Sequence, residues 1–213
     1  MARARSVTSR AKLRRRALGI LHHLQRFGAQ PGDKLILHVA SNEQFIDAFW
    51  ACLYGGIVPV PVAVGISDEH KHKLLRIARQ LGNPFLYTDR KLLERLAGFA
   101  TAQGESATWA ALAPRAFLID TLDDITREGT PARISREQTA FIQFSSGSTS
   151  EPKGVVLTHG NILANAEGVR QAIGLDANDV ALSWMPLTHD MGLIGFHLML
   201  LYAGARQYLM PTE

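Results

Sequence analysis

The sequence is poor in the features that mark secreted and membrane proteins. Its single cysteine, Cys52, excludes a disulfide framework within the chain and fits a reducing compartment. The longest apolar run, Met191 to Ala203, is too short to cross a bilayer and contains His197. The charged start has no apolar stretch behind it, so we expect no secretory signal. These absences predict a cytoplasmic protein without a transmembrane segment.

Acidic residues are missing from the first 32 positions, which hold eight Arg and Lys. The other 181 residues hold 15 basic and 19 acidic side chains, so the net charge of +4 comes from this N-terminal arm. A basic arm suits a nucleic-acid or membrane-surface contact. No basic stripe continues downstream, which favours the solvated face of a first helix and predicts no nucleic-acid partner.

Strand and helix patterns alternate along the chain. Residues 13–27 repeat apolar side chains at helical spacing, and short apolar or β-branched runs alternate with further helical segments. The expected strands are 35–39, 57–64, 85–88, 117–120, 139–144, 155–158, 180–184 and 207–210, and the expected later helices are 43–54, 68–81, 90–100, 160–173 and 189–203. This order predicts an α/β fold with layered, mostly parallel sheets and flanking helices. Trp50 and Trp184 are expected in the core.

We divide the chain into three parts that together form one incomplete large domain. Residues 1–32 are the basic arm and first helix, residues 33–138 a first α/β part, and residues 139–213 a second α/β part with the loop described below. The last strand is followed by no helix that could cover it, which indicates a fragment of something larger.

A loop rich in hydroxyl groups and glycine joins the strands expected at 139–144 and 155–158. Its sequence is Ser145-Ser146-Gly147-Ser148-Thr149-Ser150-Glu151-Pro152-Lys153-Gly154. Glycine lets backbone N–H groups face an anion, hydroxyls donate hydrogen bonds to phosphate oxygens, and lysine adds a cation. On composition alone a flexible linker is an equal alternative. The tight bracketing by apolar strands and the lysine beside proline favour a loop that binds a triphosphate.

The loop differs from a Walker A loop, in which Gly-Lys-Ser/Thr leads straight into a helix. Here the lysine precedes Gly154, and the β-rich stretch 155–157 follows. We therefore expect the loop to lie between the two strands of a hairpin.

Two segments of the second half resemble motifs of one enzyme family. Residues 141–144, followed by the loop 145–154, resemble the AMP-binding signature of adenylate-forming enzymes. These enzymes include acyl-CoA synthetases, fatty acyl-AMP ligases and peptide-synthetase adenylation domains. Residues 185–193, Met-Pro-Leu-Thr-His-Asp-Met-Gly-Leu, are similar to the family's next motif, beside the acyl pocket. Ser150 and residues 189–192 look closer to the fatty acyl branches than to amino-acid activators.

The resemblance implies a reaction and a set of site residues. A carboxylate would attack the α-phosphorus of ATP, giving acyl-AMP and pyrophosphate, and the acyl group would pass to CoA or to carrier-protein phosphopantetheine. The implied ATP contacts, with Mg²⁺ held at Thr149, are Ser145, Ser146, Gly147, Ser148, Thr149, Ser150, Lys153 and Gly154. The implied catalytic residues are Lys153 and His189, and the implied substrate contacts are His189, Met191, Gly192 and Gly195.

Residue chemistry alone leaves other interpretations open for these positions. Without the resemblance, Lys153 is equally an exposed surface lysine and His189 a capping or core histidine. The apolar helix after His189 is then part of the hydrophobic core. The family's later motifs are absent, so these 213 residues are expected to be inactive alone. The alternative function is a non-catalytic, truncated homologue that serves as an interaction or scaffold module.

Overall fold

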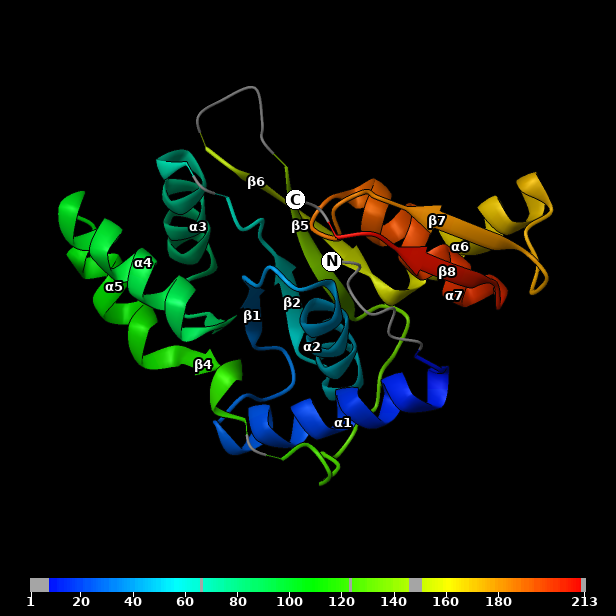
Figure 1. The fold of residues 1–213 in the computed structure, drawn as a ribbon, viewed down its shortest axis with the longest axis horizontal. Coiled ribbons are helices and arrows are strands. Elements are labelled where there is room, and N and C mark those ends of the chain that lie inside the picture. Colours follow the sequence, from blue (N-terminus) through cyan, green and yellow to red (C-terminus); the bar gives the residue numbers. More distant parts are fainter. Residues whose placement is uncertain (1–7, 66, 123, 146–150, 212–213) are drawn as a thin grey trace, which may run out of the picture.

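The computed structural model describes residues 8–65, 67–122, 124–145 and 151–211 (Figure 1). Its first half is built on a four-stranded, fully parallel sheet in the order β2-β1-β3-β4. The strands are β1 (Lys34–Leu37), β2 (Val58–Pro61), β3 (Phe85–Thr88) and β4 (Ala116–Leu118). Proline has no N–H to donate, so Pro59 and Pro61 suit the position of β2 at one end of this ladder.

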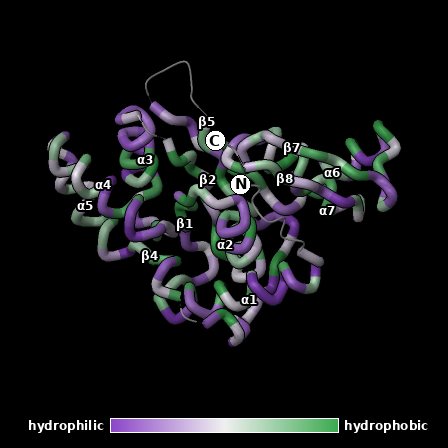
Figure 2. The backbone as a smooth tube through the Cα atoms, viewed as in Figure 1, coloured by the Kyte–Doolittle hydropathy of each residue, from purple (hydrophilic) through white to green (hydrophobic). Residues whose placement is uncertain are grey.

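Helices cover both faces of this sheet. They are α1 (Arg10–Arg26), α2 (Asn42–Gly55), α3 (Asp68–Leu81), α4 (Arg90–Ala102) and α5 (Ser106–Leu112), with single 3₁₀ turns η1 (Ala113–Arg115) and η2 (Ile119–Thr121). Successive strand residues face opposite sides: Leu35 and Leu37 pack in one core with α1 and α2, whereas Ile36 packs in a second core with α3, α4 and α5. In Figure 2 hydrophobic colour runs along the strands in the middle of the molecule.

The second half adds a hairpin and a small sheet. Strands β5 (Thr139–Ser145) and β6 (Lys153–Thr158) pair antiparallel, as the loop sequence predicts. Helix α6 (His159–Ile173) follows, and β7 (Val180–Ser183) pairs in parallel with β8 (Arg206–Leu209). The crossover between them is a π-helix, η3 (Met191–Leu198), continued by the short helix α7 (Met199–Ala203). The helix predicted over 189–203 is therefore present from Met191 to Ala203, with π-helical geometry in its first eight residues.

The α/β class with parallel sheets and flanking helices is confirmed, but one core prediction is wrong. The Trp184 side chain is 66% exposed, and Val180, Leu182 and Tyr208 are about half exposed in the same small sheet. Among the described residues, nothing buries this face of β7 and β8. Trp50 is half-buried, and Cys52 is fully buried.

Candidate functional site

The hairpin presents both ends of the hydroxyl-rich loop to solvent. Ser145, the last residue of β5, pairs across the ladder with Lys153, the first residue of β6, and both are exposed. The other predicted phosphate contacts, Ser146, Gly147, Ser148, Thr149 and Ser150, lie outside the described residues. The structure therefore places the lysine and one hydroxyl opposite each other at the base of the loop.

Side-chain packing explains why glycine occupies position 154. Its φ is not among the positive values that favour glycine, because it lies in the β6 ladder opposite Phe144. A Cβ atom at this position would lie 2.9 Å from Cζ of Phe144 and 3.1 Å from Cγ2 of Ile142. The missing side chain makes room for the Phe144 ring.

The far end of the loop is held against α3. The side-chain amide of Gln80 donates a hydrogen bond to Oε2 of Glu151 (3.3 Å), and Pro152 is buried. These contacts fix the chain immediately before Lys153. The acidic residue of the loop is thus directed toward Gln80 on the neighbouring helix.

A hydrogen bond joins the hairpin to the second predicted motif. The side-chain amide of Gln143, on β5, donates to the backbone carbonyl of Thr188 at 2.8 Å. Because Gln143 is two residues before Ser145 and Thr188 directly precedes His189, this bond brings the two motifs side by side. Sequence reasoning missed the role of Gln143, although a polar residue inside the apolar run 141–144 was a usable signal.

His189 lies beside Asp190 on the surface of this junction. Nδ1 of His189 is 2.7 Å from Oδ1 of Asp190, and the two side chains are 60% and 67% exposed. The same Asp190 oxygen accepts a hydrogen bond from the backbone N–H of Met191 (2.7 Å), so the carboxylate caps the start of η3. Its negative charge at a helix N-terminus is favourable.

The three predicted acyl-pocket residues behave differently. Met191 is 53% exposed, whereas Gly192 is buried. A Cβ atom on Gly195 would lie 3.0 Å from Sδ of Met191, so Met191 lies across Gly195. A Cβ atom on Gly192 would lie only 2.2 Å from the carbonyl oxygen of Pro186. Glycine at 192 is therefore required by close approach of the backbone.

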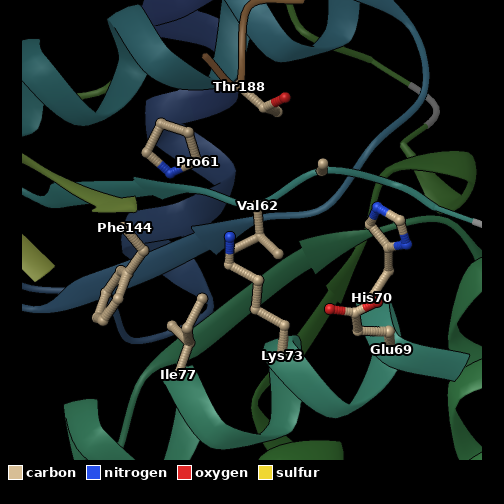
Figure 3. Close-up of a pocket in the computed structure, with 9 residues that line it drawn as sticks. Pro61, Val62, Glu69, His70, Lys73, Ile77, Phe144 and Thr188 are labelled. Carbon is tan, nitrogen blue, oxygen red and sulfur yellow. The ribbon is translucent and has the colours of Figure 1, made fainter. Parts of the chain in front are cut away.

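A cavity of about 280 Å³ opens where the two motifs meet α3 (Figure 3). Phe144 from β5 and Thr188 from the second motif both line it. The rest of the lining comes from the end of β2 and the residues after it (Pro61, Val62 and Ala63) and from α3 (Glu69, His70, Lys73 and Ile77). Figure 3 shows the Lys73 side chain directed from α3 into this space. Lys73 was not singled out from the sequence, because a lysine on an amphipathic helix gives no signal of its own.

No three His, Cys, Asp or Glu side chains gather into a possible metal site within the described ranges. His159 is partly buried, and that burial lowers its pKa. The described residues also include no helix long and apolar enough to span a membrane.

Comparison with known proteins connects this geometry to a family. Residues 3–213 match the AMP-binding enzyme family. A Caulobacter vibrioides protein described as an acyl-CoA synthetase is 34% identical over 95% of the chain. The long-chain-fatty-acid–AMP ligase FadD28 of Mycobacterium tuberculosis is 29% identical over 86% of the chain. The chain spans 35% and 32% of the lengths of these two relatives.

Solved structures agree with the sequence comparisons. The adenylation domain of a keto acid-selecting NRPS module, bound to a keto acyl adenylate, superposes with a TM-score of 0.86 and 29% identity over 99% of this chain and 37% of its own. The fatty acid AMP ligase from Legionella pneumophila gives a TM-score of 0.83 and 27% identity over 99% of this chain and 35% of its own. The chain belongs to the AMP-binding enzyme family.

Proposed function

We propose that these residues form the first part of an enzyme that uses ATP to activate a carboxylic acid, preferably a fatty acid. A carboxylate oxygen attacks the α-phosphorus, the bond from that phosphorus to the bridging oxygen of the β-phosphate breaks, and the products are acyl-AMP and pyrophosphate. The acyl group then passes to the thiol of CoA or of a carrier-protein phosphopantetheine. Relatives named as acyl-CoA synthetase and fatty-acid–AMP ligase support this proposal.

The observation that carries the proposal is the hydrogen bond between Gln143 and Thr188. It brings the base of the phosphate-binding loop next to the segment that begins with His189. A phosphate group and an acyl carboxylate must meet within bonding distance for adenylation. These two motifs, far apart in the sequence, are adjacent in the fold.

We assign the charge-stabilising role to the loop. Lys153 neutralises the charge that grows on the departing pyrophosphate, and Ser145, with the hydroxyls and amides of residues 146–150, donates to the phosphate oxygens. In phosphoryl chemistry of this kind the protein mostly positions groups and neutralises charge. The exposure of Ser145 and Lys153 leaves both accessible to a nucleotide.

We assign His189 to the acyl carboxylate and α-phosphate, and Met191, Gly192 and Gly195 to the wall of the acyl pocket. The exposed Met191 is the only one of the last three that presents a side chain. Mg²⁺ prefers phosphate oxygens, water and one or two protein oxygens, and no described cluster offers a separate site. We therefore place Mg²⁺ on the ATP phosphates with the Thr149 hydroxyl.

The buried, unpaired thiol of Cys52 suits the reducing cytoplasm that we propose as the location.

Acid-dependent exchange of labelled pyrophosphate into ATP tests the proposal in the longer protein that contains these residues. Lys153→Ala should lower the exchange rate by about 10²–10³-fold, the usual effect of removing one transition-state donor. Lys91→Ala, which removes another exposed lysine on α4, is the matched control and should leave the rate unchanged. The 213-residue chain alone should show only background exchange. Equal rates for wild type and Lys153→Ala would favour the scaffold alternative.

A further inference from the structure

A buried histidine connects η3 to two other elements, α2 and β8. His197 is 3% exposed and lies in the π-helix η3. The indole N–H of Trp50, on α2, points at Nε2 of His197 at 3.0 Å, and Oε1 of Gln207, on β8, lies 2.9 Å from its Nδ1. The imidazole is therefore held between the first α/β part and the last strand.

The partners determine the protonation state of the ring. An indole N–H only donates, so Nε2 of His197 must be the acceptor and carries no proton. A neutral ring then has its proton on Nδ1, which donates to Gln207 Oε1. Burial lowers the pKa of His197 to about 4, so the ring stays neutral at pH 7. Each polar atom of the ring has a partner in this one tautomer.

The helix that carries His197 needs such a restraint. Hydrogen bonds in a π-helix run from residue i to i+5, one residue further than in an α-helix, and this rare geometry occurs mostly as single turns, frequently at functional sites. Relaxation to an α-helix would rotate residues on one side of His197 by about 100° relative to those on the other. At its start η3 is fixed by Gly192 against Pro186, and near its end by His197.

We propose that His197 is a positioning residue: held between Trp50 and Gln207, it fixes the π-helical register of residues 191–198 and thereby the placement of Met191 and Gly192. The role assigned to it acts through η3, because its two ring nitrogens are already bonded to Trp50 and Gln207. Its effect on the reaction rests on the proposed function, because Met191 and Gly192 are assigned there to the acyl pocket. The effect of His197 on the geometry of η3 is independent of the proposed function.

The first test needs no activity and uses hydrogen exchange of the backbone amides in this chain. His197→Leu fills a similar volume with an apolar side chain and so removes both hydrogen bonds. Trp50→Phe removes only the indole donor. Both variants should lose about tenfold or more protection at the amides of residues 191–196, beyond any change in the rest of the chain. His197→Gln, whose amide oxygen is able to replace Nε2 as the acceptor, should retain most of it.

The matched control is His38→Gln, which alters another buried histidine, directly after β1 and outside this hydrogen-bonded chain. It should change protection only in proportion to global stability. Unchanged protection of residues 191–196 in His197→Leu, or an equal loss across the whole chain, would overturn the proposal.

The second test measures acid selectivity in the active, longer protein. The ratio of kcat/KM for a long and a short fatty acid should change about tenfold in His197→Leu, since misplacement of about 1 Å in a pocket wall has effects of at least that size. The ratio should stay constant in His38→Gln and recover in His197→Gln. A constant ratio in His197→Leu would overturn the link to the acyl pocket. A wild-type protein without exchange activity would instead count against the proposed function, and the amide measurement would still decide the register.

Discussion

Replacement of Gly192 by alanine should destabilise the protein strongly, although alanine is the better helix former. The added Cβ would lie 2.2 Å from the carbonyl oxygen and 2.8 Å from the carbonyl carbon of Pro186, and 2.9 Å from the carbonyl oxygen of Met185. All three neighbours are backbone atoms, which cannot rotate away as a flexible side chain would. The segment before η3 must therefore move for the methyl group to fit.

The magnitude follows from three contributions. Overpacking of a rigid site costs up to about 3 kcal/mol. The Pro186 carbonyl accepts a hydrogen bond from the N–H of His189 (3.0 Å), and its displacement weakens this bond by about 1 kcal/mol. The gain in helix propensity from glycine to alanine offsets about 1 kcal/mol. The net expectation is a loss of about 3 kcal/mol in the free energy of unfolding.

Urea denaturation at pH 7 measures this loss as a lower midpoint with an unchanged slope. Gly98→Ala is the matched control, because Gly98 lies inside α4 and an added Cβ there would meet no atom within 4 Å apart from the backbone of its own helix. That variant should gain about 0.5–1 kcal/mol. If Gly192→Ala were neutral or stabilising, the close approach to Pro186 would not describe the protein.

The remaining predictions concern pH and exposure. Burial holds the pKa of His197 at about 4, below its ordinary 6.5, so the unfolded chain takes up a proton first as the pH falls. Between pH 6.5 and 4 the wild type should therefore lose up to about 1.4 kcal/mol per pH unit more than His197→Gln, in denaturation at each pH; parallel profiles would contradict this. Trp184→Ser should change the free energy of unfolding by less than about 0.5 kcal/mol, whereas Phe49→Ala, at a fully buried ring, should cost about 3–5 kcal/mol. Similar losses for both would refute the exposure of Trp184.

Local sequence signals were sufficient for most of the secondary structure. Helix α3 and strand β3 have the bounds expected from the sequence, because residues that favour helix starts and chain breaks, Ser67, the Gly82-Asn83-Pro84 run and Asp89, stand at their ends. The hairpin was predicted for a similar reason: two apolar strands enclose a loop that is unable to continue either one. The division at residues 32 and 138 stays a prediction.

Features that depend on tertiary contacts were not predictable in the same way. An apolar tryptophan in a strand is ordinarily buried, so the exposure of Trp184 follows only from which elements lie against β7. The π-helical geometry of η3 was not predictable, because a segment of eight residues is too short for its hydrophobic pattern to distinguish a π-helix from an α-helix. The bond from Gln143 to Thr188 joins positions 45 residues apart. The roles of Lys153 and His189 rest on motif chemistry and stay predictions.

The central claim, that a carboxylate attacks the α-phosphorus of ATP at this site, is tested most directly by isotope transfer. A fatty acid labelled with ¹⁸O in its carboxylate is incubated with ATP, a thiol acceptor and the longer protein, and the AMP is analysed by mass spectrometry. The account predicts AMP that carries one ¹⁸O atom, because one carboxylate oxygen stays on phosphorus when the acyl group leaves. Formation of unlabelled AMP, or of ADP, would contradict it.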